Sequence, residues 1–499
     1  MGKFLSFVML GVLLFFFFGK GSLEAGEIFV VNEDDSHFYG SRKPEEMNRE
    51  GLLAWVDQYA GTKVTHLFLC PNCKNADFDS QTREAVWKHL DRNPNSLWPA
   101  NAKRLHDAGL DAYEVWIARC REKGISPWIT MRMNDVHAVN DVEHWIHSSF
   151  WRNHPEYWLP NRGLNYARKE VYEHNISFVR ELFERYDMDG IELDWMRFCR
   201  LLTPGKEQEE AFLLTQFVAE TRKLADAWGK KRGHEISVSV RVPTHPDTAD
   251  ALGIRAVEWA RKGLVDWIVP APEWSTTDFD IPVGLWKERL AGTEVKLVPC
   301  IEHSMKAHPQ RPRTANDLAS LYGWAETMRF RGADGVYLFN WMDCWTLPVS
   351  VADYAHLLKT GLGAEFLATQ GKRYPITYRD TVAGGVSRGI QLGKHQNEGG
   401  TFTVPHGAAT GYVAVILGID GANGRAAEVR LNGVSPISSG WDKQPAEGIP
   451  CDATWRAIFP ETALKPGDAI VTVVPCPEAS GTIDWLEIRV EPSEEGGGA

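Results

Sequence analysis

The sequence predicts an α/β protein: a (β/α)8 TIM barrel followed by a C-terminal antiparallel β-sandwich. From Glu27 to about Gly363, eight short β-branched or aromatic runs alternate with amphipathic stretches, which is typical of a parallel α/β fold. After Tyr374 the pattern changes to short alternating strands broken by Gly, Asn and Asp, which favours a sandwich. The chain has 499 residues, of which 43% are hydrophobic, so both units can build a core.

The eight runs and the stretches between them give the expected order of elements. Strands are expected at residues 28–31, 64–70, 126–131, 190–195, 236–242, 265–269, 296–301 and 335–341. Helices are expected at residues 44–59, 112–123, 169–186, 207–229, 253–262 and 315–331. Sandwich strands are expected at residues 389–392, 400–404, 411–417, 427–431, 455–459, 469–474 and 483–490. A closed barrel requires eight β units with α units between them.

The ends of the chain differ in composition from the rest. Lys3 precedes an apolar stretch over 4–18, and small residues follow at 22–25, which is the pattern of an export signal. The stretch is shorter than the roughly 20 residues of a membrane span. We therefore expect a signal peptide over 1–25, a catalytic barrel over 26–370, a β-sandwich accessory module over 371–492 and a disordered tail over 493–499. A secreted or periplasmic protein without a stable membrane span after cleavage follows, with an uncleaved anchor as the alternative.

Charge and motifs exclude several classes of function. The net charge of −12 argues against a nucleic-acid partner, although a local Arg and Lys cluster could still bind an anionic glycan. The sequence contains no phosphate-binding loop, no Gly-x-Ser-x-Gly elbow and no His-Glu-x-x-His pair, so we expect neither a cofactor nor a metal. The acidic run 32–35 is interpreted as substrate contacts or a solvated loop, with calcium binding as the less favoured alternative.

Barrel enzymes carry their chemistry at the carboxyl ends of the strands. In this chain nearly every expected strand ends in polar, charged or aromatic residues. The candidates for substrate binding at these ends are Arg132, Asn134, Arg241, His245, Trp274, His303, Asn340 and Trp341. Tryptophans can stack on sugar rings, and arginines can bind hydroxyls or an anionic substituent.

The fourth expected strand carries the strongest chemical signal. Strand alternation places Glu192, Asp194 and Met196 on one face. Two carboxylates in a buried strand are costly unless they are paired or used. They are therefore catalytic candidates, and the alternative is that they only pair with arginines such as Arg132 and Arg241.

The segment Asp189-Gly190-Ile191-Glu192-Leu193-Asp194-Trp195 resembles the fourth-strand motif of family 18 chitinase-type hydrolases. It is more similar to the Asp-Gly-Ile-x-x-Asp-x-x-Arg strand of the family 10-like bacterial glycosyl hydrolases. The chitinase motif has its acid Glu where this chain has Met196, so the resemblance implies a barrel glycosidase without that acid. Asp194 then becomes the best fourth-strand carboxylate.

Glycoside hydrolysis usually requires a second carboxyl group. Glu273, at the end of the sixth expected strand, resembles the second acid of several retaining α-glycosidase clans. Glu302 ends the seventh strand, where β-retaining barrel glycosidases keep their nucleophile, but this chain lacks the Asn-Glu pair of that clan. We favour Glu273.

The sequence therefore predicts a secreted glycoside hydrolase acting on a polysaccharide or oligosaccharide, an anionic one included. Asp194 is predicted as nucleophile or base and Glu273 as general acid, with Glu192 beside Asp194. The alternatives are a hydrolase that uses Glu302 as the second carboxylate and a non-catalytic barrel that only binds glycan.

Overall fold

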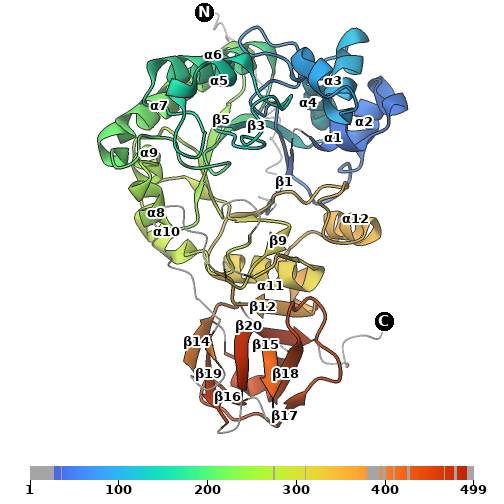
Figure 1. Cartoon of the computed structure of the whole chain (residues 1–499), viewed down its shortest axis with the longest axis vertical. Coiled ribbons are helices and arrows are strands. Elements are labelled where there is room, and N and C mark those ends of the chain that lie inside the picture. Colours follow the sequence, from blue (N-terminus) through green and yellow to red (C-terminus); the bar gives the residue numbers. More distant parts are fainter. Residues whose placement is uncertain are drawn as a thin grey trace, which may run out of the picture.

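The chain folds into a parallel β/α barrel and an antiparallel β-sandwich, and the two units lie against each other (Figure 1). The computed structural model describes residues 27–34, 36–272, 276–308, 311–378, 394–395, 400–407, 411–423, 427–465, 467–476 and 480–491. The expected signal peptide, the expected tail and the strand expected at 389–392 lie outside these residues. The expected domain boundaries at 370 and 371 remain predictions.

The barrel sheet is parallel throughout and follows the order β7-β6-β5-β4-β3-β2-β1-β11-β8. Its strands are β1 (Ile28–Glu33), β2 (His66–Leu69), β3 (Ser126–Arg132), β4 (Gly190–Asp194), β5 (Ser237–Pro243), β6 (Trp267–Ala271), β7 (Lys296–Leu297), β8 (Cys300–Ile301) and β11 (Gly335–Leu338). Each of the eight expected runs contains a strand, and the predicted fold class is confirmed.

The sheet closes at the seventh run, which is divided into two strands. β7 pairs with β6, and β8 pairs with β11. Between them the Val298 N–H donates to the Ile268 carbonyl at 3.0 Å, and the Pro299 carbonyl accepts from the Tyr337 N–H at 3.1 Å. Proline has no N–H for the ladder, which accounts for the interruption. One segment thus joins both edges of the sheet, as barrel closure requires.

Helices surround the barrel strands (Figure 1). The α-helices are α1 (His37–Ser41), α2 (Arg49–Asp57), α3 (Leu97–Asp107), α4 (Ala112–Glu122), α5 (Ser149–Asn153), α6 (Lys169–Arg185), α7 (Glu207–Arg232), α8 (Pro246–Ala251), α9 (Ala256–Arg261), α10 (Val283–Arg289), α11 (Leu318–Phe330), α12 (Val351–Thr360) and α13 (Ala364–Ala368). Short 3-10 turns are η1 (Pro44–Glu46), η2 (Val86–Arg92), η3 (Pro155–Tyr157) and η5 (Glu461–Ala463). Within the described part of the chain, no helix is long and apolar enough to cross a bilayer.

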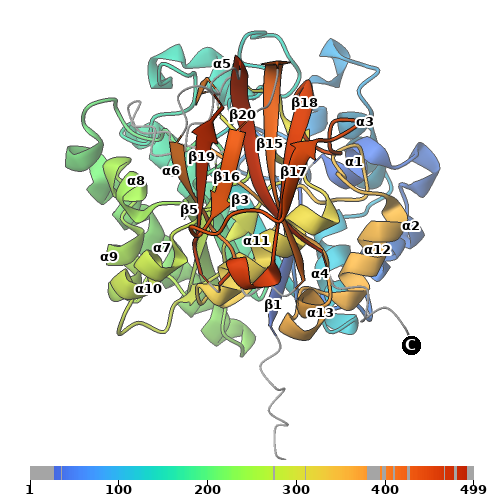
Figure 2. The same ribbon diagram turned by 90° about the horizontal axis from the view of Figure 1, so that it is seen from below.

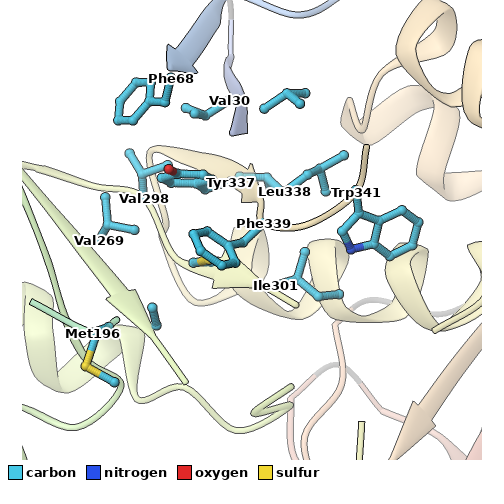
Figure 3. Packing of buried hydrophobic residues seen from close by; sticks show 14 of the residues in the cluster. Val30, Phe68, Met196, Val269, Val298, Ile301, Tyr337, Leu338, Phe339 and Trp341 are labelled. Atoms are coloured by element: carbon cyan, nitrogen blue, oxygen red, sulfur yellow. The ribbon is translucent and has the colours of Figure 1, made fainter. Parts of the chain in front are cut away.

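Aromatic side chains fill the interior of the barrel below the carboxyl ends of its strands. Phe68 stacks on Trp128 with ring centroids 4.8 Å apart, and Tyr337 meets Phe68 edge-on at 5.2 Å. A Cβ atom at Gly190 would lie 2.4 Å from the Trp128 ring, so β4 must begin with glycine. In Figure 3, Tyr337 and Phe339 project to the same side of β11, toward Val269 and Val298. This aromatic packing leaves the carboxyl ends of the strands for polar chemistry.

The C-terminal unit is a sandwich of a six-stranded and a three-stranded antiparallel sheet. The larger sheet contains β12 (Lys372–Pro375), β13 (Lys394–His395), β15 (Tyr412–Asn423), β17 (Ser438–Trp441), β18 (Ala453–Phe459) and β20 (Ser480–Glu491). The smaller sheet contains β14 (Gly400–Val404), β16 (Ala427–Leu431) and β19 (Ala469–Pro475), and a separate pair consists of β9 (Ser304–Met305) and β10 (Thr314–Ala315). Trp485 is core at 1% exposure, whereas Trp441 is 37% exposed.

Ion pairs join the two units. Seen from below, the sandwich strands lie over α11 (Figure 2). Arg373 of β12 donates to Glu487 of β20 at 2.8 Å and to Asp317, the N-cap of α11, at 2.5 Å. His308, in the loop between β9 and β10, contacts Asp484 of β20 at 3.0 Å. These contacts fix the sandwich to the barrel.

Candidate active site

β4 carries Glu192 and Asp194 into the barrel at different depths. Glu192 is completely buried and accepts hydrogen bonds from Thr130 at 2.8 Å, Tyr337 at 3.1 Å and Ser239 at 3.3 Å. Burial, together with the nearby Asp194 carboxylate, raises the pKa of Glu192 to about 8. Because desolvation disfavours the charged form, Glu192 holds its proton at neutral pH.

Asp194 belongs to a set of three charged residues that we call the inner cluster, Asp194, Arg241 and Glu302. Nη1 of Arg241 lies 3.0 and 3.1 Å from the two carboxylate oxygens of Asp194. Nη2 of Arg241 lies 3.8 Å from Oε1 of Glu302. The N–H groups of Met196 and Arg197 also donate to Asp194 Oδ1, at 3.0 and 3.1 Å. One guanidinium therefore separates two carboxylates from β4 and the end of β8.

Glu302 is held from the β11 side as well. Its Oε2 accepts from Asn340 at 3.2 Å and lies 3.3 Å from Nδ1 of His303. Asn340 adopts a φ of +61°, a left-handed conformation that asparagine tolerates better than most residues. Oε1 of Glu302 is buried without a hydrogen-bond partner among the described residues, and its nearest cation is Arg241. Glu302 is completely buried.

A second set of charges, the outer cluster, consists of Asp34, Arg132, Asp135 and Arg197. Asp34 bridges two arginines: Oδ1 accepts from Arg132 at 2.6 Å and Oδ2 accepts from Arg197 at 2.7 Å. Arg132 also donates to Asp135 at 2.5 Å, and Lys74 approaches the other oxygen of Asp135 at 3.2 Å. Although burial opposes it, the cations around Asp135 hold its pKa well below the usual range.

The outer cluster borders a cavity of about 410 Å³ at the carboxyl end of the barrel. Its walls include three tryptophans, Trp98, Trp145 and Trp345, together with Asp34, Ser36, Gly40, Ser96, Leu97, Arg132, His137, Ala138, His144, Ile146 and Arg197. Trp98 and Trp145 meet edge-to-face with centroids 5.1 Å apart. Trp345 is 64% exposed. A cavity of this size with aromatic walls and a few charged groups is typical of a small-molecule site.

A larger hollow of about 610 Å³ lies at the other end of the barrel. It is bordered by the end of α7 and by residues that precede β5 and β6, among them His234, Glu235 and Asp266. The amino ends of barrel strands contribute to stability, whereas the carboxyl ends carry function. The 410 Å³ cavity is therefore the better candidate for a substrate site.

The predicted binding residues fall into several groups. Arg132 borders the cavity, while Arg241 and Asn340 belong to or support the inner cluster. Asn134 binds the Leu164 and Arg200 carbonyls, and His245 caps α8. Trp341 is buried and donates to the Glu302 carbonyl, and the His303 side chain is 20% exposed. Glu273 and Trp274 lie outside the described residues.

Among the tryptophans and arginines that border the cavity, Trp98, Trp145 and Arg197 were not predicted as site residues. Trp98 comes from α3 and Trp145 from the loop after β3, so neither follows a barrel strand directly. Arg197 stands three residues after Asp194 and had a signal: it is the arginine of the Asp-x-x-Arg pattern. The search for polar residues at the carboxyl ends of the expected strands finds Asp34 and Arg132 of this cavity.

A third group of charged side chains, His37, Glu33 and Asp343, lies after the carboxyl ends of β1 and β11. His37 contacts Glu33 closely through Nδ1 and Asp343 at 2.8 Å through Nε2. Burial lowers the pKa of His37, but the two carboxylates outweigh burial and raise it to about 9. This histidine is therefore a buried cation. Within the described residues, no three His, Cys, Asp or Glu side chains are arranged to hold a metal.

No protein-family model matches the chain, and no curated protein matches it either. Among solved structures, a chitinase from a Paenibacillus species matches with a TM-score of 0.40 at 9% identity, over 92% of this chain and 52% of that one. An α-L-fucosidase from Paenibacillus thiaminolyticus matches with 0.36 at 13%, over 90% and 96%.

A cycloisomaltooligosaccharide glucanotransferase from Paenibacillus matches with a TM-score of 0.33 at 12% identity, over 93% of this chain and 57% of that one. The chain thus spans little more than half the length of this enzyme and of the chitinase. Glycoside hydrolases occur among these neighbours. At such low similarity they do not indicate what this chain does, and its chemistry has to be derived from its own residues.

Proposed function

We propose that the protein is a glycoside hydrolase whose substrate binds in the 410 Å³ cavity and reacts beside Asp194. One observation carries the proposal: Arg197 borders the cavity with its side chain, while its backbone N–H donates to Asp194 at 3.1 Å. A single residue, Arg197, thus joins the Asp194 carboxylate to a tryptophan-walled cavity at the carboxyl end of a barrel.

Asp194 suits the role of nucleophile or base. Arg241 faces both of its oxygens, and two backbone N–H groups fix the orientation of the carboxylate. A preorganised anion of this kind favours positive charge that develops at the sugar carbon. Glu192, which is neutral and buried below it, has no access to solvent and acts as a positioning residue.

The second carboxylate is proposed to be Glu273. β6 ends at Ala271, and β6 pairs with β5, which pairs with β4. The residues after Ala271 therefore follow a strand two places from Asp194, at the carboxyl end. Glu302 is the alternative, but it is completely buried and held by Asn340, so it would have to become exposed to protonate a leaving group.

A non-catalytic glycan-binding barrel is the second candidate. It is favoured by the pairing of both Asp194 oxygens with Arg241, which would also stabilise a barrel without catalysis. Loss of hydrolysis in the variants below, or its absence in the wild type, separates the two candidates.

The test is hydrolysis of plant and marine polysaccharides by the full chain and by Asp194→Asn. We expect the variant to lose more than about 10³-fold in kcat while it still retains oligosaccharide. Asp189→Asn is the matched control, because Asp189 stands at the other end of the same strand and pairs with Arg121; it should keep its activity. Unchanged turnover by Asp194→Asn would remove Asp194 from the mechanism.

Glu273 is tested separately. Glu273→Ala should lose activity on the natural substrate, keep it on an aryl glycoside whose leaving group needs no acid, and gain from added azide. Glu302→Gln is the comparison variant. If Glu273→Ala hydrolyses the natural substrate normally and Glu302→Gln does not, Glu302 is the second carboxylate.

A further inference from the structure

We propose that the 410 Å³ cavity binds an anionic substituent, a sulfate ester or a carboxylate, on a sugar ring that stacks against Trp345. The inference rests on the proposed function and names the substrate class for that site. It depends on the juxtaposition of Arg132, Arg197 and Trp345 around one cavity.

The first argument is charge. Among the residues that border the cavity, two guanidinium groups face one carboxylate, that of Asp34. Asp135 lies behind Arg132, but it is shared with Lys74. Guanidinium groups at a cavity favour the oxygens of an anionic ligand over those of a neutral sugar.

The second argument is an unmet hydrogen-bonding group. The side chain of Arg197 is only 6% exposed, and its Nε and Nη1 have no hydrogen-bond partner within the described residues. Buried polar groups are nearly always paired, so such a group requires an explanation. Arg197 binds Asp34 through Nη2 alone, and a guanidinium with donors left over matches the oxygens of a sulfate or carboxylate.

The third argument is the aromatic surface. Trp345 is 64% exposed, and a Cβ at position 40 would lie 2.9 Å from its Cη2 atom. Gly40 therefore lets the indole lie directly against α1 with its other side toward solvent. Trp98 and Trp145, in edge-to-face contact with each other, line the same cavity. His144 contributes a neutral ring, because burial lowers its pKa. Stacking holds the sugar, and Arg197 selects its substituent.

The test compares charged polysaccharides with neutral versions of the same backbone. The probes are a sulfated galactan with its desulfated form, and polygalacturonate with its carboxyl-reduced form. Binding to the full chain is measured by affinity electrophoresis at fixed ionic strength, because exposed charges are screened by salt. We expect one charged member to bind about tenfold or more tightly than its neutral partner. The preferred pair identifies the anion as sulfate or carboxylate.

Three variants assign the preference to the cavity. Arg197→Gln should abolish the preference for the charged member, and Arg197→Lys should restore part of it. Trp345→Ala should weaken binding of both members to the same degree. Arg261→Gln, an exposed arginine at the end of α9, changes the net charge equally and should leave the preference intact.

Equal binding of charged and neutral members by the wild type overturns the proposal, and so does a preference that survives in a folded Arg197→Gln variant. Asp194→Asn, which is expected to lack hydrolysis, should keep the preference. If Asp194→Asn remains active while the charge preference depends on Arg197, the catalytic assignment fails and the binding inference stands.

Discussion

The inner and outer clusters both consist of arginines and carboxylates but differ in what lies beside them. In the inner cluster, Arg241 is 1% exposed and stands between two carboxylates within the strand ends. In the outer cluster, Arg132 and Arg197 are also buried, at 3% and 6%, yet both border the 410 Å³ cavity. Burial therefore does not separate Arg241 from the arginines for which we propose ligand binding. The neighbouring cavity does.

The largest expected effect is on the inner cluster. Arg241→Met removes the cation that Asp194 and Glu302 share and leaves two carboxylates facing each other in the barrel. We expect a loss of about 3 to 5 kcal/mol in the free energy of unfolding, measured by urea denaturation with far-UV circular dichroism. Arg261→Met, an exposed control, should change it by less than about 0.5 kcal/mol. An equally small effect at Arg241 would contradict the structural role.

Glu192 makes the inner region sensitive to pH. The folded protein keeps the Glu192 proton up to about pH 8, whereas the unfolded chain releases it near pH 4.3. Its contribution to stability is thus complete below about pH 4 and is lost as the pH rises toward 8. Glu192→Gln should therefore gain stability relative to the wild type as the pH rises, by about 3 to 4 kcal/mol between pH 5 and 8. Parallel stability curves for the two proteins would argue against a neutral Glu192.

The outer cluster should tolerate the loss of an arginine better than the inner cluster does. Arg197→Met leaves Asp34 paired with Arg132 at 2.6 Å, so we expect only about 1 to 2 kcal/mol of destabilisation. The comparison with Arg241→Met, under the same conditions, measures how far the two clusters differ in their contribution to the free energy of unfolding. Equal losses would mean that the outer arginine serves the fold as much as the inner one.

The smallest effect on stability is expected at the cavity wall. Trp345→Ala should change the free energy of unfolding by less than about 0.5 kcal/mol, because the side chain is largely exposed. The affinity of the Trp345→Ala variant for oligosaccharide should nevertheless fall about tenfold, as measured by isothermal titration calorimetry. A stability loss without any change in affinity would make Trp345 a packing residue.

The fold was accessible from the sequence because hydrophobic periodicity defines it. All eight barrel runs contain strands, since each run is buried and each is followed by a helix. The division of the seventh run was not foreseen, because Pro299 interrupts the ladder without changing the apolar pattern. β12 was missed because Lys372 and Arg373 look exposed in sequence, although ion pairs with Glu326 and Glu487 bury them.

The candidate site was harder to predict from the sequence than the fold. Alternation along β4 located Glu192 and Asp194, and the pairing of Asp194 with Arg241 was one of the alternatives weighed. Arg132, however, pairs with Asp34 and Asp135 and not with the β4 carboxylates. Such choices depend on side-chain reach across the barrel, which periodicity does not encode. Trp98 and Trp145 come from connecting segments whose path is set by tertiary packing.

The ring of Phe339 has a consequence for attempts to redesign this protein. Arg241 lies over it with Cζ 3.7 Å from the centroid, and Arg197 approaches it at 5.2 Å. In Figure 3 the ring projects into the barrel beside Tyr337. A mutagenesis campaign that alters ligand preference through Arg197 thus acts on a ring that also supports the arginine holding Asp194. Double-mutant cycles between positions 197 and 241 should be non-additive, so we expect a substitution that changes the proposed selectivity at position 197 to change the proposed reaction rate as well.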